Sequence, residues 1–266
     1  MTASRPLALV TGASAGIGYA LAQQAARHGH DVIITGASGR VHDSATRLAA
    51  DTGVQVTAVQ SDLRTAEGVD QVWNAVTATG RPLAIAMLNA GVSLGGAAFV
   101  DTDLADELDE INLNVVSQVR LAKPIARHMI ANRAGRILFT SSLSATTPTP
   151  FETVYGPTRA FVYSFAQGLR QELLGTGVTV TALLPGATAT EFHARAGMGG
   201  TRFGDNSWKN DPQVVAVKGF AGLMAGRDHV IGGDRATWRA AIRQRILPER
   251  IKAAQFAKAS RPRCSQ

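Results

Sequence analysis

Short runs of apolar residues alternate along most of the chain with longer segments whose apolar positions recur at helical spacing. The apolar runs occupy residues 7–10, 31–35, 54–60, 83–88, 136–140 and 178–184. The helical patterns between them cover residues 17–28, 44–51, 66–78, 104–131 and 154–174. Strands that alternate with helices predict right-handed βαβ units and a parallel sheet. Because the runs are nearly uninterrupted, we expect helices on both faces of this sheet.

The last third of the chain has a less regular pattern. Residues 196–212 are rich in Gly, Asn, Asp and Thr and predict a mobile loop with short helical pieces. Residues 231–233 predict a last short strand, and residues 235–259 a helical segment broken at Pro248. No linker or repeat divides the chain. We therefore expect a single α/β domain over residues 1–266, with 235–266 as its basic helical extension.

Composition narrows the class of protein. The 266 residues are 45% apolar, which is typical of a globular chain with a sizeable core. The single cysteine, Cys264, allows no internal disulfide and favours a reducing, cytoplasmic location. The residues before the first strand lack the apolar core of a signal peptide, and no segment offers the ~18 apolar residues of a membrane span.

The net charge of +7 comes from one end of the chain. From Arg239 onward there are eight Arg or Lys residues and one acid, Glu249, so residues 1–238 are balanced. Nucleic-acid binding is not expected, because the sequence signatures of DNA- and RNA-binding modules are absent. A basic tail is usually a solvated helix face, although contact with an anionic membrane surface through residues 239–263 stays open.

The first apolar run leads into Thr11-Gly12-Ala13-Ser14-Ala15-Gly16-Ile17-Gly18, and a helical pattern follows at once. Glycines let the backbone turn tightly and approach a pyrophosphate, while the helix N-terminus offers free N–H groups to the anion. A lone glycine-containing loop would be weak evidence. Strand, glycine turn and helix in this order predict a Rossmann-type, doubly wound domain that binds a nicotinamide dinucleotide.

The Gly-x-x-x-Gly-x-Gly spacing resembles the short-chain dehydrogenase/reductase family, and the resemblance extends over about residues 7–192. It implies that further segments contact the cofactor: Asp62 and Leu63 at the adenine, Asn89-Ala90-Gly91 at the adenine ribose, and the segment from Pro185 and Gly186 to Thr190 at the nicotinamide carboxamide. In that segment Thr188 would use its backbone and Thr190 its hydroxyl. Alternative interpretations remain, since Asp62 could simply cap a helix and Pro-Gly could be a plain turn.

The end of the second strand usually distinguishes NAD from NADP, because an acid there binds the free ribose 2′-hydroxyl. This chain has Thr35-Gly36-Ala37-Ser38-Gly39-Arg40, and the first acid is Asp43. Ser38 and Arg40 could supply a hydroxyl and a cation to a 2′-phosphate. We therefore favour NADP over NAD.

Four residues resemble the catalytic tetrad of the family: Asn114, Ser142, Tyr155 and Arg159. Tyr155 and Arg159 are four residues apart and so share one helix face. The resemblance implies that Tyr155 is the acid in reduction and the base in oxidation. Ser142 would polarise the substrate carbonyl, and Asn114 would anchor a water through its local backbone geometry. Asn112 competes with Asn114 for that place.

The sequence departs from the family at Arg159, where the family has lysine. Arginine keeps the positive charge that favours a tyrosinate, and it can also contact the cofactor ribose. However, its planar fork is longer than an ammonium and cannot release a proton. Pro157 is compatible with a helix only in the first turn. We expect an NAD(P)-dependent oxidoreductase that interconverts a carbonyl and a secondary alcohol, with slow turnover; the alternative is a weak or inactive dinucleotide-binding protein.

The substrate is left open by the sequence. Residues 92–99, 143–151 and 191–212 would border the pocket, and their apolar members favour a small or bulky apolar carbonyl or alcohol: Leu143, Pro148, Phe151, Phe192, Met198 and Phe203. The six histidines lack metal-ligand spacing, so no catalytic metal is expected. The family resemblance implies a homodimer or homotetramer formed through helices 104–131 and 154–174.

Overall fold

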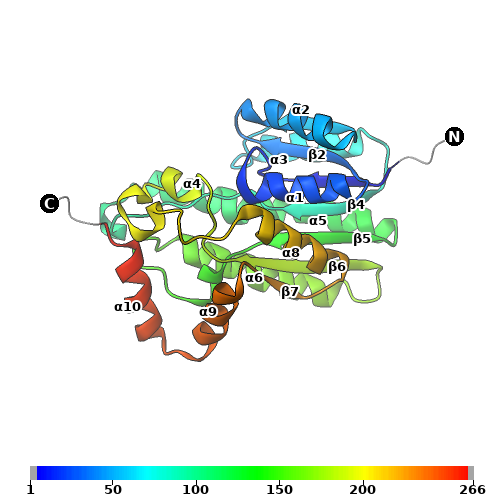
Figure 1. The fold of residues 1–266 in the computed structure, drawn as a ribbon. Helices are drawn as coiled ribbons and strands as arrows, with labels where there is room; N and C mark the ends of the chain where they lie inside the picture. Colours follow the sequence, from blue (N-terminus) through cyan, green and yellow to red (C-terminus); the bar gives the residue numbers. More distant parts are fainter. Residues whose placement is uncertain (1–4, 263–266) are drawn as a thin grey trace.

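The computed structural model describes residues 5–262, in which seven parallel strands form one sheet (Figure 1). The strands are β1 (Leu7–Val10), β2 (Asp31–Gly36), β3 (Val56–Gln60), β4 (Leu83–Leu88), β5 (Gly135–Thr140), β6 (Val178–Pro185) and β7 (His229–Gly232). They are hydrogen-bonded in the order β3-β2-β1-β4-β5-β6-β7. The expected doubly wound parallel sheet is therefore confirmed.

Helices connect and cover the strands. The helices of the main body are α1 (Gly16–Arg27), α2 (Arg40–Thr52), α3 (Ala66–Thr77), α4 (Leu104–Ile111), α5 (Ser117–Ala131), α6 (Tyr155–Glu172) and α8 (Pro212–Met224). A π turn, η2 (Asn112–Val116), joins α4 to α5. The shorter pieces are η1 (Phe99–Asp101), η3 (Leu143–Thr146), α7 (Phe192–Arg195), η4 (Met198–Gly200) and η5 (Arg202–Gly204). Two final helices lie beyond the sheet (Figure 1): α9 (Arg235–Ile246) packs near β7 and η3, and α10 (Glu249–Ser260) packs against η5.

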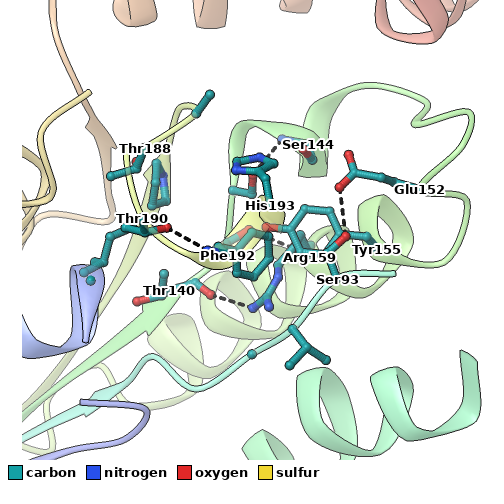
Figure 2. A pocket seen from close by; sticks show the side chains of 18 of the residues that line it. Ser93, Thr140, Ser144, Glu152, Tyr155, Arg159, Thr188, Thr190, Phe192 and His193 are labelled. Atoms are coloured by element: carbon teal, nitrogen blue, oxygen red, sulfur yellow. Dashed lines mark hydrogen bonds between the residues drawn. The ribbon is translucent and has the colours of Figure 1, made fainter. Parts of the chain in front are cut away.

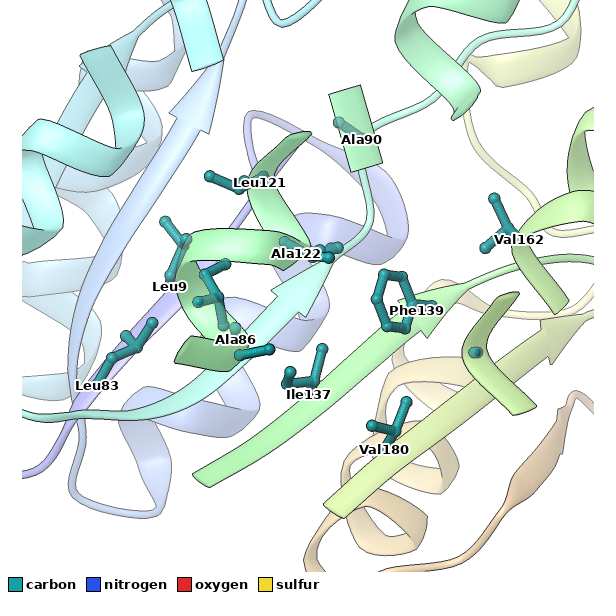
Figure 3. Packing of buried hydrophobic residues seen from close by; sticks show 14 of the residues in the cluster. Leu9, Leu83, Ala86, Ala90, Leu121, Ala122, Ile137, Phe139, Val162 and Val180 are labelled. Carbon is teal, nitrogen blue, oxygen red and sulfur yellow. The ribbon is translucent and has the colours of Figure 1, made fainter. Parts of the chain in front are cut away.

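Alternate side chains of each strand enter two separate apolar cores, one on each face of the sheet. In β1, Leu9 belongs to the core shared with α3, α5 and α6, whereas Val10 belongs to the core shared with α1, α2 and α8. Figure 3 shows the first core, where Phe139 of β5 lies fully buried near Val162 of α6. The near-continuous apolar strands thus reflect burial on both faces, as expected.

The element boundaries agree closely with the sequence-based expectations. β1 and β4 match the expected residues, and the other strands differ by at most two residues at either end. The short helical pieces expected within residues 196–212 are present as η4 and η5. The helical tail is broken at Pro248, which lies between α9 and α10. Cys264 lies outside the described residues.

Three of the longer helical segments differ from the expectation. The expected helix over residues 104–131 is interrupted by the π turn, and α8 was missed altogether. The signals of α8 are its first two residues: the Asp211 carboxylate caps the helix by accepting from Gln213 N at 2.7 Å, and Pro212 is the first helical residue. The expected helix over residues 44–51 begins earlier, at Arg40.

The strand order reverses between β1 and β4, because the chain first adds β2 and β3 on one side of β1 and then β4 on the other. Ligands of open α/β sheets bind beyond the carboxyl ends of the strands at such a reversal. Here those ends lead into the glycine turn and into Asn89. Within residues 5–262, no helix is both long and apolar enough to span a membrane.

Candidate functional site

The glycine turn after β1 enters the first turn of α1. Gly12 and Gly16 have left-handed backbone angles, with φ of 64° and 58°. A Cβ at Gly18 would lie 2.1 Å from the Gly12 carbonyl oxygen, so this close approach requires glycine. Ala15 precedes the helix and offers no side-chain cap, which leaves the first N–H groups available to an anion. The turn fits the pyrophosphate of a dinucleotide.

A cavity of about 980 Å³ opens beside this turn, at the carboxyl ends of the strands. Most of the residues that the sequence assigned to the site line it: Gly12, Ser14, Ala15, Gly16, Ile17, Gly18, Asp62, Leu63, Asn89, Ala90, Gly91, Ser142, Tyr155, Arg159, Pro185, Gly186, Thr188 and Thr190. The structure therefore brings segments from five strand ends to one space. Ser38, Arg40 and Asn114 are the exceptions.

The segment after β4 is tied to the glycine turn by hydrogen bonds. The backbone N–H groups of Asn89 and Ala90 both donate to Thr11 Oγ1, at 2.9 and 3.0 Å. The Asn89 side-chain amide donates to the carbonyl oxygens of Thr11 and Gly12 at 3.2 and 3.3 Å. Asn89 thus holds the two strand ends together, a structural role that the sequence did not indicate.

Ser38 and Arg40, the residues expected at a 2′-phosphate, lie outside the cavity lining. The Arg40 guanidinium instead forms a two-pronged pair with Glu191, in which Nη1 lies 3.0 Å from Oε2 and Nη2 lies 3.3 Å from Oε1. Both side chains are about half exposed, and Glu191 lines the cavity. The pair therefore links the start of α2 to the segment after β6 at the cavity edge.

Asp62, the residue expected at the adenine, is also engaged by a cation. Arg64 Nη2 lies 2.7 Å from Asp62 Oδ2, and Arg64 Nη1 lies 3.0 Å from Asp109 Oδ2. The hydrogen bonds from Arg64 lower the pKa of the Asp62 carboxyl. Asp62 is therefore an ionised acceptor at the cavity wall, and its partner Arg64 was not anticipated from the sequence.

Tyr155 and Arg159 lie one turn apart at the start of α6, as their spacing predicted. Pro157 is the third residue of this helix, where its missing N–H has no intrahelical acceptor to lose. Ser142 follows β5 and forms a hydrogen bond with Tyr155, while its hydroxyl also accepts from Ser144 N at 3.1 Å. Figure 2 shows Tyr155, Arg159 and Phe192 gathered around one space.

The Arg159 guanidinium is buried behind the Tyr155 ring, with 3% of the residue exposed. Nη1 donates to the Thr140 carbonyl oxygen at 3.2 Å, and Nη2 donates to Asn114 Oδ1 at 3.0 Å. Its Cζ atom lies 5.0 Å from the centroid of the Tyr155 ring. A Cβ at residue 91 would lie 2.0 Å from Nη2, so Gly91 leaves the room that the long side chain occupies. The Nε–H is buried without a partner among the described residues.

Asn114 lies in the π turn and is fully buried behind Arg159. Its Oδ1 also accepts from Val92 N at 2.9 Å, and its Nδ2 lies within 3.2 Å of Val92 O, Thr158 Oγ1 and Glu110 Oε1. Both ends of the amide are therefore fully used inside the protein. Asn114 positions Arg159 rather than lining the cavity, and π turns of this kind occur frequently at functional sites.

Two buried carboxyl groups lie beside this network, and sequence reasoning missed both. Glu110 Oε2 accepts from Leu94 N at 3.1 Å, and burial raises the pKa of Glu110 to about 8. Glu152 Oε1 accepts from Ser93 Oγ at 2.8 Å, and burial raises the pKa of Glu152 to about 7. The only signal for Glu110 was its position four residues before Asn114, on the same helix face.

The Tyr155 phenol is deeply buried, and burial raises its pKa above the ordinary value. The nearby charge of Arg159 and the hydrogen bond with Ser142 act in the opposite direction but do not overcome burial. Burial therefore favours the protonated phenol over the phenolate. A protonated hydroxyl at the cavity wall can donate a proton to an oxygen bound there.

The outer part of the cavity is walled by what we call the aromatic row: Tyr155, Phe192, His193, Phe203 and Phe256. Consecutive rings are in contact, with centroids between 5.2 and 5.5 Å apart. Burial lowers the pKa of His193 to about 4, so its ring is neutral. Of the apolar residues expected to line the pocket, Leu143, Phe192 and Phe203 do so, whereas Pro148, Phe151 and Met198 do not.

Comparison with known proteins agrees with this arrangement. Residues 6–198 match the family model of short chain dehydrogenases. The chain is 30% identical over 207 residues to the NADP-dependent 3-hydroxy acid dehydrogenase of Salmonella typhi, covering 78% of each chain. It is 34% identical over 189 residues to sulfoacetaldehyde reductase 2 of Chromohalobacter salexigens, covering 70% of this chain and 74% of the relative.

Solved structures give the same result. The short-chain dehydrogenase from Sphingobium yanoikuyae, solved in complex with NADPH, is 31% identical and superposes with a TM-score of 0.79 over 90% of this chain and 93% of the other. The bulky-bulky ketone specific alcohol dehydrogenase from Comamonas testosteroni is 27% identical, with a TM-score of 0.76 over 90% and 92%.

The family follows from the sheet, the glycine turn and these matches together. This chain belongs to the short-chain dehydrogenases, and it is an oxidoreductase that acts on alcohol or carbonyl groups with a nicotinamide dinucleotide.

Proposed function

We propose that the protein interconverts a ketone and a secondary alcohol with NADP(H), and that Tyr155 is its acid-base residue. The observation that carries this proposal is the grouping of Ser142, Tyr155 and Arg159 in one cavity with the glycine turn. A bound nicotinamide would supply or accept the hydride. The protein's part is to hold the carbonyl, exclude water and move one proton.

Each residue of the group has a distinct task in this proposal. In reduction, the Tyr155 hydroxyl donates its proton to the oxygen that was the carbonyl, and the Ser142 hydroxyl donates a hydrogen bond to the same oxygen. In oxidation, Tyr155 must lose its proton first. Burial opposes that loss, so the positive charge of Arg159 is needed to stabilise the phenolate.

The residues present fit a nicotinamide dinucleotide. The uncapped first turn of α1 would hold the pyrophosphate. The buried Arg159 Nε–H has no hydrogen-bond acceptor among the described residues, and a ribose hydroxyl could accept from it. Thr188 and Thr190 line the cavity beyond β6, where they would hold the carboxamide. A Cβ at Gly16 would lie 3.0 Å from Thr190 Cγ2, so this segment and the glycine turn enclose the same space.

NADP is the favoured form of the cofactor. No acid stands at the end of β2, and Arg40 is the nearest cation there. Two relatives use this form: the Salmonella enzyme is NADP-dependent, and the Sphingobium structure holds NADPH. In this proposal Arg40 exchanges Glu191 for the 2′-phosphate when the cofactor binds.

The substrate pocket favours an apolar carbonyl compound, because rings form much of its outer wall. We also propose slow turnover. Arg159 is fixed by Thr140 and Asn114 on two sides and cannot pass a proton onward. A homo-oligomer formed through α4, α5 and α6 is consistent with their exposed apolar side chains: Leu104, Leu108, Ile130 and Phe161.

The direct test measures oxidation of NADPH and of NADH against a panel of aliphatic, aromatic and bulky ketones and aldehydes. We expect activity with NADPH on at least one apolar ketone. Tight cofactor binding without hydride transfer to any member would overturn the proposal and favour a dinucleotide-binding protein without catalysis.

A further inference from the structure

A second cavity, which we call the basic cavity, lies next to the proposed active site. It has a volume of about 520 Å³ and is lined by Arg202, Arg243, Gln255, Lys258, Ala259 and Arg261. Four of the six residues are cationic and none is acidic. Arg202, Arg243, Gln255 and Ala259 also line the main cavity, so the two spaces are adjacent. The lining comes from η5, from α9 and α10, which lie beyond the sheet in Figure 1, and from Arg261, which follows α10.

The cations of the basic cavity differ from most other cations around the main cavity, where Arg159 is the other one without a carboxylate partner among the described residues. Around the main cavity, Arg64, Arg195 and Lys252 are each paired with a carboxylate. Within residues 5–262, none of the four cations of the basic cavity has an ion pair with a carboxylate. Arg202 and Arg261 lie instead over aromatic rings, those of Trp208 and Phe151.

Four like charges around one space repel one another, and a bound anion offsets part of that repulsion. Two of the neighbouring side chains are guanidinium groups shared with the main cavity, and their fixed donors suit a carboxylate or a phosphate. Among residues 5–262, no carboxylate pairs with this charge, and it lies where a ligand extending out of the active site would arrive.

The aromatic row connects the two cavities. It begins at Tyr155 and ends at Phe256 on α10, whose neighbours Gln255 and Ala259 line the basic cavity. An apolar chain can pack along these rings, since the neutral His193 adds no charge to the path. The structure therefore presents a proton donor, an apolar wall and a basic cavity in that sequence.

We infer that the substrate is an amphiphilic oxo compound, with its carbonyl at Tyr155, an apolar middle along the aromatic row and an anionic group in the basic cavity. This inference rests on the proposed function and specifies its substrate class. The distal group is an anion at the end of an apolar chain: a carboxylate, a sulfonate or a phosphate. Substrates with a neutral distal end should be poorer.

The test uses methyl-ketone carboxylic acids of increasing chain length, each compared with its methyl ester. We expect kcat/KM for the acid to exceed that for the ester by about tenfold at one favoured length. Raising the ionic strength from about 0.02 M to about 0.5 M should reduce this preference, because salt screens exposed charges. The combined substitution Arg202→Gln and Arg243→Gln should abolish it.

Arg239→Gln is the matched control. Arg239 is an exposed arginine of α9, the helix that carries Arg243, but it lines neither cavity. It should leave the preference unchanged. Calorimetric binding of the same acids and esters, without cofactor, gives a readout independent of turnover. Equal binding of acid and ester, unaffected by the double substitution, would overturn the inference.

The two proposals fail in different ways. If the esters are reduced with the same kcat/KM as the acids, the proposed function stands and the basic cavity does not recognise substrate. If the acids bind better through Arg202 and Arg243 but nothing is reduced, the anion site stands and the catalytic proposal fails. Analogues of the best acid in which a phosphate or a sulfonate replaces the carboxylate show which anionic group the cavity prefers.

Discussion

Arg159 Nη2 lies 3.0 Å from Asn114 Oδ1, and both side chains are buried. This contact joins α6, the helix that carries Tyr155, to the π turn η2 packed against it. It is made by a side chain long enough to reach Asn114 and the Thr140 carbonyl at once. The guanidinium is therefore a structural clamp as well as a charge beside the Tyr155 ring, and these two roles can be separated by mutation.

Arg159→Lys should raise kcat about tenfold with any accepted ketone. A compact ammonium keeps the charge beside Tyr155 and is not bound to a fixed fork geometry. Steady-state kinetics with saturating NADPH measures the change. Arg159→Gln, which removes the charge, should instead lower kcat about 100-fold. The idea of a slowed site would be wrong if the lysine variant gained nothing on every substrate.

Tyr155→Phe should lower kcat by about 10²–10⁴-fold, because it removes the proton donor. Cofactor affinity, followed by quenching of tryptophan fluorescence, should change little. Tyr163→Phe is the control, since Tyr163 lies on the same helix two turns away and contacts His229 outside the cavity lining. Retention of most activity in Tyr155→Phe would mean that another group donates the proton.

Arg40→Gln should weaken NADPH binding about tenfold and leave NADH binding nearly unchanged, because only the 2′-phosphate needs the cation. Glu191→Gln frees Arg40 from its present partner and should strengthen NADPH binding a few-fold. The pair forms a double-mutant cycle, measured by equilibrium titration. Arg47→Gln, an exposed change on the same helix, is the control. Equal effects on both cofactors would contradict the assignment of Arg40.

Glu152→Gln should make the protein more stable at pH 8 than the parent, by about 1–3 kcal/mol. Burial raises the pKa of Glu152 from 4.5 in the unfolded chain to about 7. The folded form therefore binds the proton more tightly. The stability that the bound proton of Glu152 contributes is fully present below pH 4.5 and is lost as the pH rises through about 7.

Glutamine keeps an oxygen that accepts from Ser93 and carries no charge to bury. Urea unfolding at pH 5 and pH 8 gives the two free energies of unfolding. The exposed Glu172→Gln should show no pH-dependent difference from the parent. A Glu152→Gln protein that loses stability with pH as steeply as the parent would disprove the buried-acid explanation.

The sequence was sufficient for the layered fold, because strands buried on both faces must be apolar throughout and the glycine turn has one structural use. It failed for α8, whose helical signal is an N-cap and a proline rather than an amphipathic stripe. It also failed for the π turn, since the apolar pattern of residues 104–131 continues across it.

The candidate site was predictable where it follows strand ends and not where it depends on packing. Ser142, Tyr155 and Arg159 could be placed from order and spacing. The burial of Glu110 and Glu152 could not, because acids at those positions look like any solvent-facing residues in the sequence. The engagement of Arg40 by Glu191 joins residues 151 positions apart, and no local pattern indicates such a contact.

The π turn has a consequence for how this family member can change. A regular α-helix advances about 100° per residue, so the single extra residue of the turn sets the rotational phase of α4 against α5. Deleting one residue within 112–116 would keep the helix but swing α4 by roughly that angle. The hydrogen bond from Leu94 N to Glu110 and the hydrogen bond from Arg159 to Asn114 would both be broken. One missing residue would thus disturb more of the site than any substitution at its surface.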